Sequence, residues 1–325
     1  MYSLNQLLQH INTHIAGLTF RHFPDGLYAP IEYVLSLPSK RVRPALLLMA
    51  YNLYKDELAA AYPQAVAIEI FHNFTLLHDD LMDRSSLRRG KPTVHRVWND
   101  NTAILSGDAM LVLAYRYLLT GCPPQKLAQV TTLFNKMALE VCEGQQLDME
   151  FERRNNVTVD EYLEMIRLKT AVLLAGSLQM GAILADAPEG DAELLYHFGI
   201  NIGLAFQLED DLLDVYGNPT TFGKNIGGDI LCNKKTFLLL KALQHADDEQ
   251  RRELQRWLAT EPTLEEEKIK AVVTLYNNIG VRQICEQAIQ AYIETAATSL
   301  QQLSVPAERL IELEQINKRL ARRQV

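Results

Sequence analysis

Apolar residues recur at spacings of three and four along almost the whole chain, which is the period of helices that each bury one face. Patterns that alternate between apolar and polar residues, as a half-buried strand requires, are nearly absent. The sequence therefore predicts an all-α fold. The predicted helices lie near residues 3–17, 43–56, 60–83, 99–120, 124–150, 158–185, 189–216, 234–258, 263–278, 280–303 and 305–322.

The breaks between these helices are short. They carry turn-forming residues, such as Pro123-Pro124 and Gly217-Asn218-Pro219, and none is a long polar or low-complexity linker. A chain of 325 residues exceeds the usual size of one domain. Because no linker divides it, we expect residues 1–325 to form a single helical domain, a bundle with its site in the core.

Composition limits the classes of partner. Hydrophobic residues make up 48% of the chain, enough for a large core, and the formal net charge is -8 with a pI of about 5.6. An acidic chain is not expected to bind nucleic acid, which requires a basic surface. Small phosphorylated substrates remain compatible, since a local group of basic residues can bind them.

Cysteine use and hydropathy favour a cytoplasmic protein without a membrane span. The N-terminus is amphipathic and lacks the basic segment and apolar run of a signal peptide. The most apolar stretch, 171–187, is interrupted by Ser177, Gln179 and two glycines, so we expect a core helix there. No Cys-x-x-Cys pair occurs, and reduced thiols are expected at Cys122, Cys142, Cys232 and Cys285.

An Asp-Asp-x-x-Asp pattern occurs twice, at 79–83 and at 210–214, each time after apolar residues. The first and last aspartates of each pattern are one helical turn apart and share a face. Carboxylates this close repel each other unless a cation joins them, and their hard oxygens suit Mg²⁺. A solvated acidic helix end is the alternative, but the repetition favours a metal site for a substrate diphosphate. The candidate ligands are Asp79, Asp80, Asp83, Asp210, Asp211 and Asp214.

Several groups of basic residues accompany the aspartates. Arginine binds diphosphate oxygens in a bidentate manner, whereas lysine acts as a point charge. Considered singly, each of these residues is more commonly a surface base than a ligand. The groups are Lys40, Arg41 and Arg43 before Pro44, Arg88 and Arg89 after the first pattern, and then Lys169, Lys224, Lys234 and Lys235.

Taken together, these motifs resemble the trans-isoprenyl diphosphate synthase (polyprenyl synthetase) family, in its short-chain type. The resemblance is carried by SKRVRP at 39–44, HDDLMDRSSLRRGKPTVH at 78–95, EGQQLD at 143–148, Lys169-Thr170 and the run at 206–236. It implies an isoprenoid-synthase bundle with a central cavity, a homodimer, and Mg²⁺ as cofactor. The implied reaction joins isopentenyl diphosphate to an allylic diphosphate in 1'-4 trans fashion and releases diphosphate.

The resemblance also implies roles for individual residues. The Mg²⁺ ions would be held by Asp79, Asp80 and Asp83 from one side and by Asp210 from the other, with Asp211 and Asp214 in support. The allylic diphosphate would be bound by Arg88, Lys169 and Lys224, with Thr170, Gln207 and Lys234 nearby. The isopentenyl diphosphate would be held by Lys40, Arg43, His72 and Arg89.

One histidine and two departures from the family pattern bear on this assignment. A lone histidine on an apolar helix is more commonly structural, but His72 lies two helical turns before Asp79 on the same face, which favours a role in binding. The chain has Pro38-Ser39 where the family usually has two glycines, and Asn233 where it often has glycine. Neither departure removes a charge or a metal ligand.

The resemblance implies a short product, farnesyl or geranylgeranyl diphosphate. In the family, bulky residues at the fourth and fifth positions before the first aspartate limit chain length. Here these positions are Thr75 and Phe74, and Phe71 lies one turn before Thr75. One aromatic and one small residue resemble geranylgeranyl synthases more than farnesyl synthases. Ordinary core packing is the alternative role for Phe74.

Three other functions are alternatives: a longer-chain polyprenyl diphosphate synthase, a class I terpene cyclase, and a non-catalytic synthase subunit. Terpene cyclases usually carry a different second metal motif and do not need bases for isopentenyl diphosphate. Non-catalytic subunits typically lose aspartates, and here all six remain. No constellation for nucleophilic catalysis accompanies the motifs.

Overall fold

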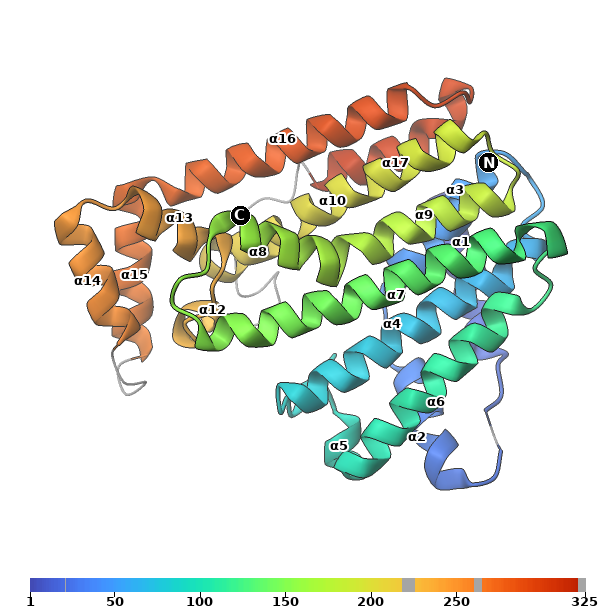
Figure 1. The fold of residues 1–325 in the computed structure, drawn as a ribbon, viewed down its shortest axis with the longest axis horizontal. Coiled ribbons are helices and arrows are strands. Elements are labelled where there is room, and N and C mark those ends of the chain that lie inside the picture. Colours follow the sequence, from blue (N-terminus) through green and yellow to red (C-terminus); the bar gives the residue numbers. More distant parts are fainter. Residues whose placement is uncertain (21, 218–225, 260–264, 321–325) are drawn as a thin grey trace. The chain divides into compact units, whose positions relative to one another are not determined.

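The structure is a computed structural model that describes residues 1–20, 22–217, 226–259 and 265–320. Nearly all of its regular structure is helical, which confirms the all-α prediction (Figure 1). The strands within the described residues are β1 (Leu87–Arg88) and β2 (Lys91–Pro92), an antiparallel pair. The helices are α1 (Leu4–Ala16), α2 (Asp25–Ser36), α3 (Val42–Asn52), the 3-10 turn η1 (Ala59–Ala61), α4 (Tyr62–Met82), α5 (Val94–Val97), α6 (Asp100–Leu119), α7 (Pro124–Arg153), α8 (Val159–Ile166), the π-helical segment η2 (Arg167–Ala171), α9 (Val172–Leu184), α10 (Glu189–Tyr216), α12 (Gly228–Leu231), α13 (Phe237–His245), α14 (Asp248–Leu258), α15 (Glu265–Ile279), α16 (Val281–Gln301) and α17 (Ala307–Leu320).

Helix α2 was not among the predicted elements. It begins directly after Pro24, and Pro30 lies inside it, so residues that usually mark turns interrupt its apolar pattern. The helix nevertheless buries Ile31, Val34 and Leu35. Tertiary packing of this face therefore outweighs the local signal for a turn.

The prediction of one helix over 234–258 was wrong, because the structure has two helices there. Helix α13 begins after Thr236, whose hydroxyl caps it, and ends at His245. The side chain of Asp247 then accepts hydrogen bonds from the backbone N–H groups of Glu249 and Gln250, which starts α14. The capping box of Asp247 and Gln250 thus divides the segment that the sequence predicted as one helix.

The described residues form two compact units. Unit 1 is built from the described parts of 1–136, 176–196 and 303–312, and unit 2 from those of 137–175, 197–302 and 313–320. The expectation of a single domain remains a prediction. The two aspartate patterns fall in different units, the first in unit 1 and the second in unit 2.

Helix α4 is central to unit 1, where α1, α2, α3 and α6 pack against it. Helix α3 is buried from Pro44 to Asn52. Gly181 allows α9 to approach α3, because a Cβ at this position would lie only 2.1 Å from the carbonyl oxygen of Leu47. The packed part of α4 leads directly into Asp79 and Asp80, so the core fixes where the first aspartate pattern begins.

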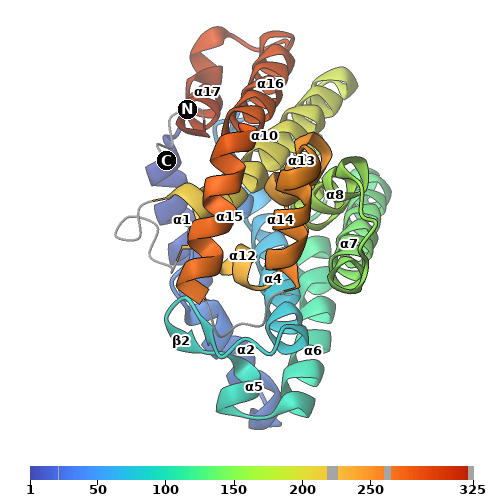
Figure 2. The ribbon, with the colours of Figure 1, turned by 90° about the vertical axis from the view of Figure 1, so that its left-hand side faces the viewer.

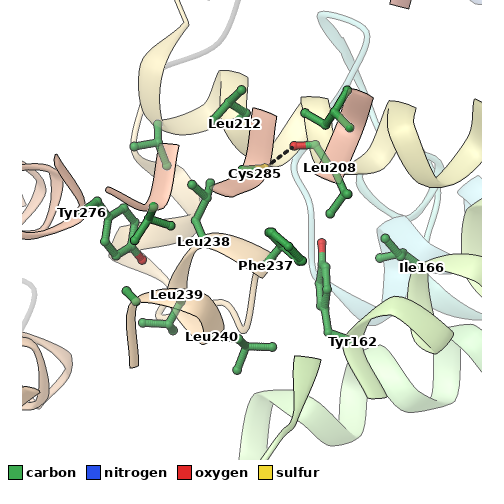
Figure 3. Close-up of a cluster of buried hydrophobic side chains, with 14 of the residues drawn as sticks. Tyr162, Ile166, Leu208, Leu212, Phe237, Leu238, Leu239, Leu240, Tyr276 and Cys285 are labelled. Carbon is green, nitrogen blue, oxygen red and sulfur yellow. Dashed lines mark hydrogen bonds between the residues drawn. The ribbon is translucent and has the colours of Figure 1, made fainter. Parts of the chain in front are cut away.

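A cluster of buried side chains forms the core of unit 2 (Figure 3). Most of its members come from helices far apart in the sequence, among them α8, α10, α13, α15 and α16. The Sγ atom of Cys285 lies 3.7 Å from the carbonyl oxygen of Leu208, which joins α16 to α10. Residues after 240, which carry no motif, therefore support the helix of the second aspartate pattern. The labelled members are Tyr162, Ile166, Leu208, Leu212, Phe237, Leu238, Leu239, Leu240, Tyr276 and Cys285.

Candidate active site

The first aspartate pattern lies at the C-terminal end of α4. Burial raises the pKa of Asp80, an effect that the positive charge of Arg88 opposes. The β1–β2 hairpin brings Arg88 back to the helix end, where its Nε and Nη2 atoms lie 2.9 and 2.6 Å from Oδ1 of Asp80. Nη2 also lies 3.3 Å from Oδ2 of Asp79. The two carboxylates therefore share one cation.

This acidic end of α4 fits a hard divalent ion. Asp83 caps the helix and is exposed. Among the described residues, no three histidine, cysteine, aspartate or glutamate side chains converge on one metal position. Oxygens of Asp79 and Asp80 nevertheless face one positive group, Arg88, and carboxylate oxygens are the ligands that Mg²⁺ prefers. Because Mg²⁺ usually takes its remaining ligands from water and substrate phosphate, few carboxylates suffice.

A group of partly buried bases lies in the same unit. The Nη1 atom of Arg43 lies 3.1 Å from Nε2 of His72. Burial, with the charges of Arg43 and three further arginines, lowers the pKa of His72 well below its ordinary value, so the neutral ring accepts a hydrogen bond from Arg43. Burial also lowers the pKa of Arg43 to about 10, and it lowers that of Arg89. The like charges of the partly buried Arg43 and Arg89 favour a bound anion, and three of the four predicted isopentenyl diphosphate ligands meet here.

The fourth residue of that set, Lys40, is exposed on the loop before α3. The next residue, Arg41, is 6% exposed and has a left-handed backbone with φ of 45°. Its guanidinium lies 2.5 Å from Oε1 of Glu69 on α4 and 2.6 Å from the carbonyl oxygen of Leu35. This ion pair fixes the loop that carries Lys40 and leads into α3, whose first turn carries Arg43.

Sequence reasoning grouped Arg41 with the candidate diphosphate-binding bases and missed its buried partner Glu69. The only local signal was a glutamate inside an otherwise apolar stretch of α4 (65–71), and a charge at such a place needs a buried partner. The amide of Asn73 also donates to Oε1 of Glu69 at 2.8 Å.

In unit 2, Asp211 points into the core rather than toward solvent. Its carboxylate accepts hydrogen bonds from the hydroxyl of Tyr162, the backbone N–H of Phe237 at 3.4 Å, and Nε2 of Gln207 at 3.3 Å. Burial is the main cause that raises its pKa to about 7. Asp211 therefore joins α8, α10 and α13, which agrees with a supporting role beside Asp210.

Lys169 and Thr170 lie in the π-helical segment η2, within what the sequence predicted as a regular helix. Extra residues in a helical turn of this kind occur frequently at functional sites. Nζ of Lys169 lies 2.6 Å from Oδ2 of Asp148, and Oγ1 of Thr170 lies 3.2 Å from Oε1 of Gln207. Gly144 makes room for the segment, since a Cβ there would lie 2.3 Å from the backbone N of Lys169. Both Gly144 and Asp148 belong to the EGQQLD motif.

The other aspartates of the second pattern, Asp210 and Asp214, lie near the C-terminal end of α10, and Lys234 follows this helix. The second pattern ends with Asp214, whose Oδ2 accepts the backbone N–H of Asp229 at 3.0 Å. The backbone N–H of Lys234 in turn donates to the carbonyl oxygen of Asp229 at 2.9 Å. Lys224 lies outside the described residues.

The candidate chain-length residues lie on the buried face of α4. Phe71 is fully buried and Phe74 is 9% exposed, and their ring centroids are 5.6 Å apart. Phe71 also meets the ring of Phe134 on α7 at 5.3 Å. Thr75 donates its hydroxyl to the carbonyl oxygen of His72 at 2.8 Å. The two phenylalanines thus belong to one aromatic group below Asp79.

Comparison with known proteins decides the family. The family model described as polyprenyl synthetase matches residues 24–276, a range that contains every predicted site residue. The chain belongs to the polyprenyl synthetase family. It is therefore a prenyltransferase of isoprenoid biosynthesis.

The similarity extends over the whole chain. A short chain isoprenyl diphosphate synthase of Methanocaldococcus jannaschii is 39% identical over 273 residues, which cover 84% of this chain and 83% of that protein. A crystal structure of a geranylgeranyl pyrophosphate synthase is 44% identical, covers 100% of both chains, and superposes with a TM-score of 0.95. The geranylgeranyl pyrophosphate synthase from Corynebacterium glutamicum, complexed with isoprenyl diphosphate and magnesium, is 29% identical with a TM-score of 0.83, and the match covers 99% and 96% of the chains. These matches do not favour the terpene cyclase and non-catalytic alternatives.

Proposed function

We propose that this polyprenyl synthetase condenses isopentenyl diphosphate with an allylic diphosphate in the 1'-4 trans manner and yields farnesyl or geranylgeranyl diphosphate. The observation that carries the proposal is the pairing of two kinds of site in unit 1. Asp79 and Asp80 form an acidic end that suits a metal-bound diphosphate, while Arg43, His72 and Arg89 form a separate basic group for a second anion.

The reaction begins when the carbon–oxygen bond of the allylic diphosphate breaks and both electrons leave with the diphosphate. Arg88 and Lys169 bind this leaving group and stabilise its growing charge. Thr170 and Gln207 orient their dipoles toward the allylic cation without attacking it. The surrounding apolar side chains exclude water, which would otherwise trap the cation.

The alkene of isopentenyl diphosphate then attacks the cation and forms the new carbon–carbon bond. Arg43, Arg89 and Lys40 hold the diphosphate of this second substrate so that its alkene lies within reach. The resulting tertiary cation loses a proton, which the released diphosphate accepts. No protein nucleophile takes part.

Mg²⁺, when bound, would neutralise the charge of the allylic diphosphate and of the leaving group. Asp79, Asp80, Asp83 and Asp210 are the residues that would hold it. Asp211 and Asp214 support this set through their bonds to neighbouring helices. The magnesium in the related Corynebacterium glutamicum structure supports the assignment.

We also propose that the protein acts as a homodimer in the cytoplasm. Helix α6 is the described helix that is long and apolar enough to cross a membrane by length and composition. Its exposed residues Ile104, Leu105 and Val112 form part of an apolar face, with exposures of 46%, 61% and 69%. A second copy of the chain would cover this face, and Val112→Glu should shift the mass measured by light scattering from dimer to monomer.

The test of the proposed reaction is incubation of the purified protein with isopentenyl diphosphate and, separately, dimethylallyl, geranyl and farnesyl diphosphate. Chromatography of the products should show chains of fifteen or twenty carbon atoms. Products of thirty or more carbon atoms would support a longer-chain synthase, and failure to consume isopentenyl diphosphate with any primer would overturn the proposal.

A further inference from the structure

The short helix α12 links the second aspartate pattern to Lys234. Left-handed backbone conformations flank it, with φ of 86° at Gly227 directly before the helix and 54° at Asn233, two residues after it. Glycine adopts this conformation freely, and asparagine is one of the few other residues that tolerates it. Asn233 therefore carries a side chain at a position of unusual backbone geometry.

One side of this turn is tied to Asp214. The backbone N–H of Gly227 donates to the carbonyl oxygen of Asp214 at 2.6 Å, and the N–H of Asp229 donates to its Oδ2 at 3.0 Å. The N–H of Lys234 closes the turn onto the carbonyl oxygen of Asp229 at 2.9 Å. The conformation of this turn therefore sets the position of Lys234 relative to the second aspartate pattern.

The other side of the turn is held by α15, which lies beside α12, and by α14, which packs against α15 (Figure 2). Nζ of Lys268 on α15 donates to Oδ1 of Asn233 at 2.7 Å, and Nδ2 of Asn233 donates to the carbonyl oxygen of Leu258 on α14 at 3.0 Å. The next residue of α15, Ile269, packs against Gly227, where a Cβ would lie 2.7 Å from its Cδ1. Two consecutive residues of α15 thus fix both ends of the turn.

Lys268 is an unusual residue for this position. It is only 2% exposed, and burial lowers the pKa of its ammonium group. A buried ammonium is costly unless it is hydrogen-bonded, so the bond to Asn233 accounts for a lysine at this place. The hydrogen bonds of the Asn233 side chain in turn hold its backbone in one conformation, which a glycine at this position would leave less restricted.

We propose that Lys268 is a positioning residue, which acts through Asn233 to hold Lys234 in place for the allylic diphosphate. The inference rests on the proposed function and extends it to α14 and α15, which carry none of the family motifs. Positioning groups of this kind typically change activity by about ten- to hundredfold when they are removed.

The decisive variant is Lys268→Met, which keeps the length and apolar stem of the side chain but removes its donors. Steady-state kinetics should show a rise of about tenfold in KM for the allylic diphosphate, with KM for isopentenyl diphosphate changed by less than about twofold. Lys268→Arg keeps a donor and should restore most of the affinity. The matched control is Lys270→Met, since Lys270 lies on the same helix and is exposed.

Asn233→Gly separates positioning from stability, because glycine accepts the backbone conformation without the side-chain bonds. It should raise the same KM, and adding Lys268→Met should then have little further effect. Thermal unfolding of each variant shows whether it is folded. If Lys268→Met does not fold, Asn233→Gly provides the test. Wild-type KM in Lys268→Met, equal rises for both substrates, or additive effects in the double variant would overturn the inference. Failure of the wild type to make any prenyl product would instead overturn the proposed function.

Discussion

Replacing Phe74 by alanine should lengthen the product. Its ring is nearly buried and meets Phe71 and His78 at centroid distances of 5.6 and 4.8 Å. Truncation of a buried phenylalanine costs about 3–5 kcal/mol if the cavity stays empty. One more isoprene unit adds five carbon atoms, and burial of these contributes roughly 4 kcal/mol at about 0.8 kcal/mol each. A longer tail therefore offsets most of the cost, which favours the longer product.

Phe71 provides a graded comparison. It is fully buried between Phe74 and Phe134, so Phe71→Ala should lower the free energy of unfolding by about 4–5 kcal/mol, near the upper end of the range for such truncations. The double variant should extend the product beyond that of Phe74→Ala alone. Chromatography of dephosphorylated products measures chain length, and urea unfolding measures stability.

The control for this experiment is Phe20→Ala. Phe20 is 4% exposed and lies outside α4, so its truncation should lower stability without changing chain length. A folded and active Phe71/Phe74 double variant with the wild-type product distribution would refute the reasoning. The limiting residues would then lie elsewhere, for example near the buried Met110.

Three further predictions concern metal, substrate and pH. Asp79→Ala and Asp210→Ala should each reduce turnover by several orders of magnitude without unfolding the protein, and near-normal turnover of either variant would contradict their role. Arg89→Ala should raise KM for isopentenyl diphosphate by roughly ten- to hundredfold, because a charge-assisted contact contributes ~1.5–3 kcal/mol, and Lys224→Ala should do so for the allylic substrate. Equal effects on both substrates would show that this division is wrong. The folded protein lowers the pKa of His72, so below about pH 6.5 the unfolded chain binds a proton on this ring that the folded protein does not. The free energy of unfolding therefore falls as the pH is lowered, by up to about 1.4 kcal/mol per pH unit. His72→Gln should remove this component in urea unfolding at low pH, and an unchanged pH dependence would contradict it.

Residues that act through local spacing were predictable from the sequence. The two aspartate patterns, Arg88 and the Lys169-Thr170 pair lie in long motifs, and helical periodicity placed most helices within a few residues. The all-α fold follows from the same periodicity. The structure brings Arg43, His72 and Arg89 close together, and their role in binding isopentenyl diphosphate stays a prediction.

Features that depend on contacts between distant segments were not predictable. The buried pair of Arg41 and Glu69 joins the loop before α3 to α4, and neither local sequence indicates its partner. The π-helical turn around Lys169 depends on the close approach of Gly144 rather than on a local propensity. The bond between Lys268 and Asn233 spans 35 residues and lies in a region without motifs.

The most direct test of the central claim is the rate of diphosphate release from isopentenyl diphosphate and geranyl diphosphate, measured with Mg²⁺ and with EDTA. We predict release that requires both substrates and Mg²⁺, with farnesyl or geranylgeranyl diphosphate as the coupled product, and its loss in Asp79→Ala. Release at an undiminished rate in EDTA, or release from geranyl diphosphate alone without a new carbon–carbon bond, would contradict the account.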